Sequence, residues 1–160
     1  MDQLPREMSI DDAPIILNFD GLCEPKNPGG IATYGVIIRK GGKKLFEGAG
    51  LAYAEPWTPE ASNNVAEYSA IIRGLEWLKQ NGYLDSKILV RGDSRLIISQ
   101  LNGTYKVKAI RLVELFRRAV ELLSEFKDIK IEWVDRSLNS EADLLSRIAY
   151  ARESKRHPSK

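Results

Sequence analysis

Sulfur and imidazole side chains are scarce in this chain of 160 residues, which has one cysteine, Cys23, and one histidine, His157. A single cysteine excludes an internal disulfide framework and a cysteine-rich metal site, and it suits a reducing compartment. No apolar run approaches the roughly 18 residues that a membrane-spanning helix needs, and the acidic N-terminus lacks the features of a secretory signal peptide. We therefore expect a soluble cytoplasmic protein with no membrane partner.

A large net charge is also missing, because 24 Lys and Arg residues against 22 Asp and Glu residues leave a net charge of +2. A bulk charge this small does not by itself indicate a nucleic-acid partner. The length and the hydrophobic share of 43% fit a single core. We expect a flexible acidic extension over residues 1–13, one domain over 14–150 and a basic tail over 151–160, in a monomer with no obligate protein partner. The tail is either a phosphate contact or a frayed solvated end.

The first third of the chain has the two-residue period of strands. Ile15, Leu17 and Phe19 alternate and predict a strand that ends at Asp20-Gly21. Residues 24–30 predict a loop, because prolines remove donors and glycines favour turns. Residues 32–39 and 43–53 flank a glycine turn and predict a hairpin. The chain is thus expected to begin with three antiparallel strands.

Helical spacing replaces this pattern after residue 59. Apolar residues recur every three or four positions from Val65 to Leu78, which predicts a helix that stops at Asn81-Gly82. Residues 87–91 predict a strand buried on both faces, followed by a short helix over 94–101, a longer helix through residue 126, a strand over 129–133 and a last helix from about residue 139. The order β-β-β-α-β-α-α-β-α indicates an α/β fold, a mixed five-stranded sheet with helices on its faces.

Four carboxylates are placed where these elements could bring them together. Asp20 and Asp93 end two strands that we expect near the middle of the sheet, where open α/β sheets gather their sites. Glu67 lies in the first turns of one helix and Asp143 in the first turn of the last. Oxygen donors without His or Cys suit Mg²⁺ or Mn²⁺, and two such ions would support hydrolysis of a phosphodiester.

Each of these acids also has an ordinary structural explanation. Asp20 fits a turn residue at a strand end, and Glu67 fits the solvated face of a helix. Asp93 could cap the helix that follows it, and Asp143 has the Ser-x-x-Asp spacing of a capping box. Spacing alone leaves both interpretations open.

The residues around the four acids form recognisable motifs. They are Phe19-Asp20-Gly21-Leu22-Cys23 with Asn27-Pro28-Gly29-Gly30 and Tyr34-Gly35, Ser62-Asn63-Asn64-Val65-Ala66-Glu67-Tyr68, Arg91-Gly92-Asp93-Ser94, and Leu138-Asn139-Ser140-Glu141-Ala142-Asp143-Leu144-Leu145. In this order, over nearly the whole domain, they resemble the motifs of the type 1 ribonuclease H family. A single motif would be weak evidence, whereas four in the family's order are strong evidence.

The resemblance implies an endonuclease that hydrolyses the RNA strand of RNA/DNA hybrids and leaves 5′-phosphate and 3′-hydroxyl ends. It implies that two Mg²⁺ or Mn²⁺ ions per site are bound by the catalytic carboxylates Asp20, Glu67, Asp93 and Asp143. It further implies that the substrate is contacted by Asn27, Ser62, Asn63 and Asn64. Amides can donate to and accept from a 2′-hydroxyl, although turn and capping asparagines are the ordinary alternative.

Two departures from the family pattern limit what the resemblance carries over. Many bacterial members have a histidine in the loop before the last helix, but residues 135–138 contain none, and our hypothesis is that Arg136 supplies part of its role electrostatically. Many members also have a basic insertion before the long helix, for which residues 103–108 leave no room. Tyr105, Lys106 and Lys108 are candidate phosphate contacts in its place, with Arg111 and the basic tail; solvated surface is the alternative.

Two other functions fit the same features. One is another two-metal nuclease of this fold, such as a junction resolvase, because a fold does not select a substrate. The other is a non-catalytic module that binds hybrids. The pair Asn63-Asn64 favours hybrid cleavage over the first, and an intact set of four carboxylates argues against the second.

Overall fold

The sequence patterns give rise to a mixed sheet and four α-helices within residues 12–103 and 106–159, the part of the chain that the structure, a computed structural model, describes. The strands are β1 (Ile15–Glu24), β2 (Ile31–Lys40), β3 (Lys43–Leu51), β4 (Lys87–Gly92) and β5 (Asp128–Trp133). The helices are α2 (Asn63–Gln80), α3 (Arg95–Leu101), α4 (Ile110–Ser124) and α5 (Ser140–Arg156), with the short 3₁₀ helix η2 (Arg136–Leu138) before α5. The predicted element order is confirmed.

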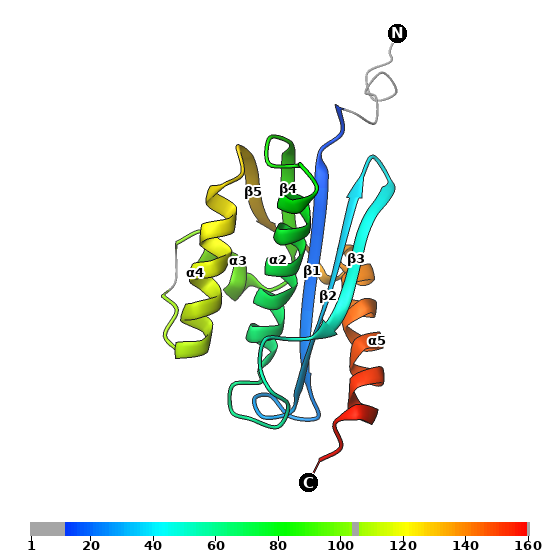
Figure 1. Ribbon diagram of the computed structural model, residues 1–160, viewed down its shortest axis with the longest axis vertical. Coiled ribbons are helices and arrows are strands. Elements are labelled where there is room, and N and C mark those ends of the chain that lie inside the picture. The colour runs from blue at the N-terminus through cyan, green and yellow to red at the C-terminus, as the bar shows by residue number, and fades with distance from the viewer. Residues whose placement is uncertain (1–11, 104–105, 160) are drawn as a thin grey trace.

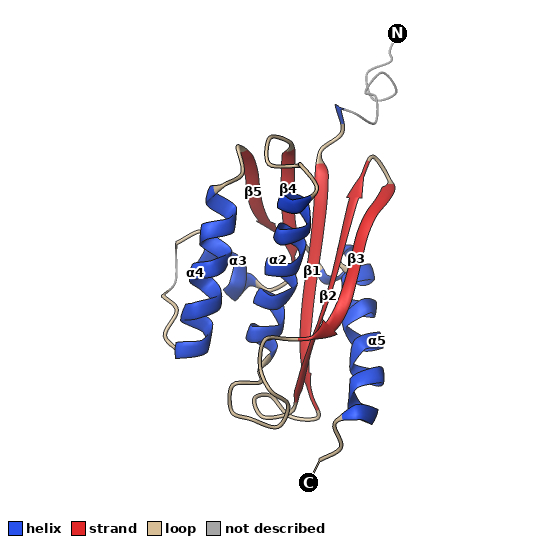
Figure 2. Cartoon of the chain, in the orientation of Figure 1, coloured by secondary structure: helices blue, strands red, loops and turns tan. Residues whose placement is uncertain are grey.

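The five strands form one sheet in the order β3-β2-β1-β4-β5 (Figures 1 and 2). The strands β1, β2 and β3 pair antiparallel through short connections, whereas β4 pairs parallel with both β1 and β5. Parallel neighbours need a crossover: α2 carries the chain from β3 back across the sheet to β4 beside β1, and α3 and α4 connect β4 with β5. The predicted mixed sheet is therefore confirmed.

Helices cover both faces of this sheet at β1 and β2. Gly74 of α2 packs against Leu17 and Val36, whereas Gly35 packs against the backbone of Ala142 in α5. Because successive strand residues point to opposite faces, α2 and α5 lie on opposite sides of the sheet. Residues 31–38 of β2 are buried on both faces for this reason. Figure 1 shows α4 beside α2, and α5 running along β2 and β3.

Strand β1 differs from the prediction, because it does not end at Asp20. It pairs with β2 along its whole length, from Ile15 opposite Lys40 to Glu24 opposite Ile31. Its pairing with β4 stops earlier, at Asn18 opposite Arg91. Asp20 thus lies within a strand, at the point where β1 has lost one of its two neighbours.

The sequence predicted that β4 is buried on both faces, and this prediction is wrong. Ile88 and Val90 are fully buried, but Leu89 and Arg91 are only partly covered. The physical reason is the position of α5, which packs against β1, β2 and β3 and leaves the far face of β4 partly open.

The last helix extends into the segment that the sequence assigned to a basic tail. It continues to Arg156, and Glu153 is buried with its carboxylate 3.0 Å from Arg152, 3.3 Å from Arg156 and 3.4 Å from His157. The ion pairs of Glu153 with Arg152 and Arg156 favour the helix there. Among the described residues, no helix is long and apolar enough to cross a membrane.

Candidate active site

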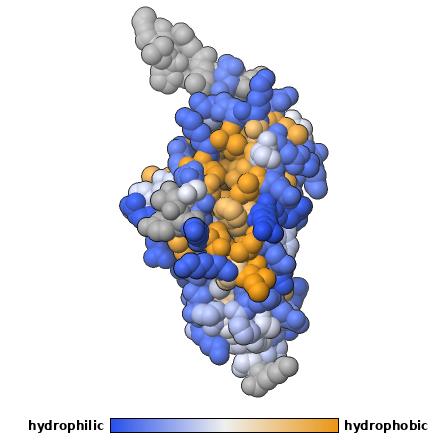
Figure 3. All heavy atoms as spheres, turned by 90° about the vertical axis from the view of Figure 1, so that its left-hand side faces the viewer, coloured by the Kyte–Doolittle hydropathy of each residue, from blue (hydrophilic) through white to orange (hydrophobic). Residues whose placement is uncertain are grey.

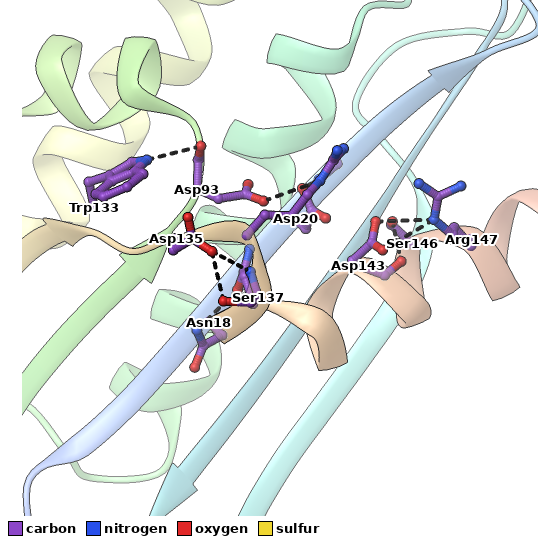
Figure 4. Close-up of polar contacts among 12 residues, drawn as sticks. Asn18, Asp20, Asp93, Trp133, Asp135, Ser137, Asp143, Ser146 and Arg147 are labelled. Carbon is purple, nitrogen blue, oxygen red and sulfur yellow. Dashed lines mark hydrogen bonds and ion pairs between the residues drawn. The ribbon is translucent and has the colours of Figure 1, made fainter.

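The sheet register brings Asp20 and Asp93 together. The pairing between the neighbouring strands β1 and β4 ends at Asn18 opposite Arg91, and Asp20 and Asp93 each follow two residues later. Because the two strands are parallel, both acids lie at the same level, just beyond the end of this pairing. Figure 4 shows their side chains directed toward one another.

Helix α2 adds Glu67 to this pair. Ser62 caps the helix by accepting a hydrogen bond from the backbone N–H of Val65 at 3.1 Å. The helix then rests directly on β1, because a Cβ on Gly21 would lie only 2.5 Å from the Cβ of Ala66. As a result, one carboxylate oxygen from each of Asp20, Glu67 and Asp93 lies within 4.8 Å of the others.

Burial makes this group of three acids electrostatically costly. Glu67 is 5% exposed, and its Oε1 has no hydrogen-bond partner among the described residues. Burial, followed by the charges of Asp20 and Asp93, raises the pKa of Glu67 well above its ordinary value. Burial and the charge of Asp93 raise the pKa of Asp20 to about 7, although the N–H of Gly21 donates to it at 2.9 Å. An orphaned, buried carboxylate oxygen among like charges fits a bound divalent cation.

Neither Asp20 nor Asp93 has the ordinary role that the sequence left open. Asp20 is not a turn residue, because β1 continues through it. Asp93 does not cap α3, because the hydroxyl of Ser94 accepts the hydrogen bond from Ile97 N–H at 3.3 Å.

Asp143 occupies a different environment from the other three acids. It is not in the group within 4.8 Å, its side chain is 29% exposed, and Arg147 Nε lies 3.2 Å from each of its oxygens (Figure 4). It does not act as a helix cap either, since Asn139 is the N-cap residue of α5 and makes no side-chain capping bond. Asp143 nevertheless lies near Asp20, and it is a minor contributor, after burial and Asp93, to the raised pKa of Asp20.

Asn139 has a structural role that the sequence analysis missed. Its side chain is buried, donates to the carbonyl oxygen of Phe19 at 2.9 Å and accepts from Asn18 Nδ2 at 3.0 Å. These bonds fasten the start of α5 to β1 directly beside Asp20. The sequence signal was an asparagine at the expected start of a helix, four residues before an acid.

The asparagines predicted to contact substrate lie beside the carboxylates. Asn27 and Asn63 form a reciprocal pair, in which Asn27 Nδ2 donates to Asn63 Oδ1 at 2.9 Å and Asn63 N–H donates to Asn27 Oδ1 at 3.0 Å. Both line a hollow of about 510 Å³ with Ser62 and Asn64. Asn63 also lines the adjoining cavity of about 480 Å³ that holds the three acids. The two hollows therefore form a continuous surface.

The predicted basic residues are placed less uniformly. Arg136 lies on η2 at the cavity rim, 80% exposed, with its Nε 3.9 Å from Asp93 Oδ2. Lys106 and Lys108 are exposed on the segment before α4 and line neither hollow. Tyr105 lies outside the described residues.

Comparison with known proteins identifies the family of this chain. A family model described as reverse transcriptase-like matches residues 18–149. The structure of RNase H1 from the archaeon Halobacterium salinarum superposes with a TM-score of 0.74 at 34% identity and covers 87% of this chain and 98% of that one. The chain belongs to the type 1 ribonuclease H family. The family resemblance inferred from the motifs is therefore confirmed.

Two further relatives of the ribonuclease H family are similar over most of the chain. The N-terminal RNase H domain of Rv2228c from Mycobacterium tuberculosis has a TM-score of 0.77 at 30% identity, covering 90% of this chain and 98% of that one. LC11-RNase H1, solved in complex with an RNA/DNA hybrid, has a TM-score of 0.75 at 34% identity, covering 87% and 98%.

The full-length relatives are longer than the matched region. The bifunctional protein Rv2228c is 36% identical over 132 residues, which make up 82% of this chain but 34% of the relative. Ribonuclease HI of Halobacterium salinarum is 37% identical over 128 residues, 80% of this chain and 60% of the relative. The chain thus spans about a third of the length of Rv2228c and somewhat under two thirds of the length of the Halobacterium ribonuclease HI.

Proposed function

We propose that this chain is an endonuclease that hydrolyses the RNA strand of RNA/DNA hybrids with the help of two divalent metal ions. The observation that carries the proposal is the convergence of Asp20, Glu67 and Asp93 within 4.8 Å, with one buried glutamate oxygen left unpartnered. This arrangement disfavours three ionised acids unless a cation neutralises them. Membership of the type 1 ribonuclease H family supports the same reaction.

The proposed metal ligands are the three converging acids and Asp143, which would join them by exchanging Arg147 for a cation. An all-oxygen donor set suits Mg²⁺ or Mn²⁺ rather than a softer metal. Bound ions would supply Lewis-acid stabilisation of the charge that develops on the phosphate during an in-line displacement.

The chain's own side chains would prepare the rest of the site. The paired amides of Asn27 and Asn63, next to Asn64 and Ser62, are suited to the sugar edge of the hybrid. An amide can both donate to and accept from a 2′-hydroxyl, which separates RNA from DNA. The hybrid bound in the LC11-RNase H1 structure supports this assignment by analogy.

Arg136 would act as a mobile cation at the cavity rim. Its position near Asp93 suits attraction of the phosphate or release of the charged product, but a guanidinium does not act as a base at neutral pH. Arg136→Ala is expected to slow turnover, with partial retention in Arg136→Lys. Unchanged turnover of the alanine variant would remove this role.

The expected products carry 5′-phosphate and 3′-hydroxyl ends. In the proposed hydrolysis the incoming oxygen comes from water and the bond from phosphorus to the 3′ oxygen breaks, which leaves these two ends. Attack by the neighbouring 2′-hydroxyl would instead break the bond to the 5′ oxygen and leave a cyclic phosphate. The test is to analyse the 3′ ends of the products: a cyclic phosphate or a 3′-phosphate contradicts the proposed chemistry.

A substrate panel tests the function as a whole. Labelled RNA/DNA hybrid, duplex RNA, duplex DNA and a four-way junction are each incubated with Mg²⁺, Mn²⁺ or EDTA. Metal-dependent cutting confined to the RNA of the hybrid is the expected result. Junction cutting would favour another nuclease of the same fold, and hybrid binding without cutting would favour a binding module. Asp20→Asn is the matched control, since it removes a ligand charge with almost no change in shape.

A further inference from the structure

A second hollow adjoins the carboxylate cavity, and none of the roles assigned above uses it. It is lined by Arg95, Leu96, Ile98, Ser99 and Trp133. Arg95 and Trp133 line the carboxylate cavity as well, so the two hollows share a wall. Figure 3 shows apolar side chains gathered in a band on the side of the molecule where α3, α4 and β5 lie. Leu96 of α3 is an exposed apolar residue.

The shared wall is a stacked pair of side chains. The Arg95 guanidinium carbon lies 3.8 Å from the centroid of the Trp133 ring, within the range of a cation–π contact. The indole Nε1–H of Trp133 donates to the main-chain carbonyl of Asp93 at 3.2 Å (Figure 4). Arg95 is also two residues from Asp93 along the chain. These links hold the guanidinium at a fixed place relative to a proposed metal ligand.

Arg95 has no carboxylate partner among the described residues. Its neighbour Arg91, in contrast, pairs with Glu132 at 2.5 Å, and Arg136 faces Asp93. Arg95 is exposed. One face of its guanidinium stacks on the indole, and this leaves the N–H groups at the edge of the guanidinium free to donate. A planar, pre-oriented guanidinium with free donors is the arrangement that binds phosphate.

We propose that Arg95, seated on Trp133, binds a backbone phosphate of the RNA strand next to the phosphate that is cut. This inference rests on the proposed function. The RNA strand is assigned because Arg95 lines the cavity in which that strand would be cleaved. Trp133 is the positioning residue. Because Arg95 covers one face of the Trp133 ring, we expect this pair to bind the RNA backbone and not to stack on a base.

The first test measures hybrid binding without cutting. Asp20→Asn is titrated with a fluorescent RNA/DNA hybrid at several salt concentrations, alone and with Arg95→Ala added. We expect about tenfold weaker binding and a salt-dependence slope that falls by about one, as for one lost phosphate contact. Arg117→Ala, which removes an exposed arginine of α4 that lines none of these hollows, is the charge-matched control and should leave the slope unchanged.

The second test locates the phosphate. Single neutral methylphosphonate linkages are placed in turn on either strand around the cleavage site. One linkage on the RNA strand should weaken binding by the same factor as Arg95→Ala and have no further effect in that variant. An unchanged affinity and slope in Arg95→Ala, or coupling to a linkage on the DNA strand, would overturn the inference.

The third test addresses the role of Trp133. Trp133→Leu should reproduce the loss in affinity and slope, add little to Arg95→Ala, and be partly rescued in Trp133→Phe, whereas a merely structural role would leave the salt slope intact. Arg95→Lys, which keeps the charge but loses the planar stack, should retain only part of the affinity. If the parent protein binds hybrid and these variants behave like it, the inference fails and the proposed function stands. If the parent binds no hybrid, both fail.

Discussion

The candidate site has a buried side, formed by Asp20, Glu67 and Asp93, and an exposed side, formed by Asp143, and the two differ in how their negative charge is balanced. Asp20, Glu67 and Asp93 are held together by β1, β4 and α2 with little solvent. Among the described residues, their one cationic partner is the exposed Arg136, whose Nε lies 3.9 Å from Asp93. Asp143 is partly exposed on α5 and already paired with Arg147. The buried side therefore carries the unfavourable charge that a metal would relieve, whereas the exposed side is balanced without one.

This difference follows from how each side is built. The buried acids are fixed by strand register and by the contact of α2 with Gly21. Asp143 depends on α5, whose start is hydrogen-bonded to β1 through Asn139. Strand register and helix packing concentrate the charge of the three buried acids, whereas exposure and the pairing with Arg147 offset the charge of Asp143.

The largest expected effect separates the two sides by activity. Glu67→Gln should lower the single-turnover cleavage rate on hybrid by roughly a thousandfold, because a buried ligand that no neighbour can replace is lost. Asp143→Asn should cost roughly ten- to a hundredfold, because this ligand is partly exposed and is already balanced by Arg147. Equal losses in the two variants would contradict the division.

The next effect concerns the contact that places Glu67. Gly21→Ala should lower the free energy of unfolding by about 3 kcal/mol, at the upper end of overpacking, because its Cβ meets helix backbone at 2.6 Å and not a flexible side chain. Denaturant unfolding measures the loss. Gly42→Ala is the control, because Gly42 has a φ of +85° and open space around it, so this variant measures the cost of backbone strain without crowding.

Removing the fastening of α5 should have a somewhat smaller effect. Asn139→Ala leaves the Phe19 carbonyl and the Asn18 amide without their partner, at a cost of about 2 kcal/mol in the free energy of unfolding. Since Asp143 is on the freed helix, the cleavage rate should fall toward that of Asp143→Asn. A destabilised variant with full activity would show that Asn139 does not position the acid.

The pH dependence of stability should come from the buried side. Asp20 has a pKa of about 7 in the folded, metal-free protein, against an ordinary value of 3.8. Between these values the folded state holds a proton that the unfolded chain releases, so the free energy of unfolding falls as pH rises from about 4 to 7. Thermal unfolding in EDTA should show this fall in the parent, a weaker fall in Asp20→Asn, and recovery on adding Mg²⁺ at pH 8. Identical pH profiles for parent and variant would refute it.

The smallest effect is expected on the exposed side. Arg147→Ala removes an exposed i,i+4 ion pair, which contributes about 0.5 kcal/mol or less to stability. Its melting temperature should therefore stay close to that of the parent. A large drop would mean that the Asp143–Arg147 pair is structural, against the contrast drawn between the two sides.

Much of the fold was predictable because it follows from local periodicity. The alternation from Ile15 to Phe19 and the helical spacing from Val65 to Leu78 each reflect one buried face, and they gave the correct element order. The extent of β1 was not predictable in the same way. The strand continues to Glu24 because β2 pairs with it along its whole length, whereas its pairing with β4, more than sixty residues away in the sequence, stops at Asn18.

The sequence by itself determined the kinds of groups available: acids in four motifs, amides beside them, and only one histidine and one cysteine in the whole chain. Only the tertiary structure decided which acids share one buried space, that Asp143 stands apart with Arg147, and that Arg95 lies on Trp133. Residue type and spacing are properties of the chain. Distance, burial and the resulting pKa shifts arise only when strand register and helix packing bring remote segments together.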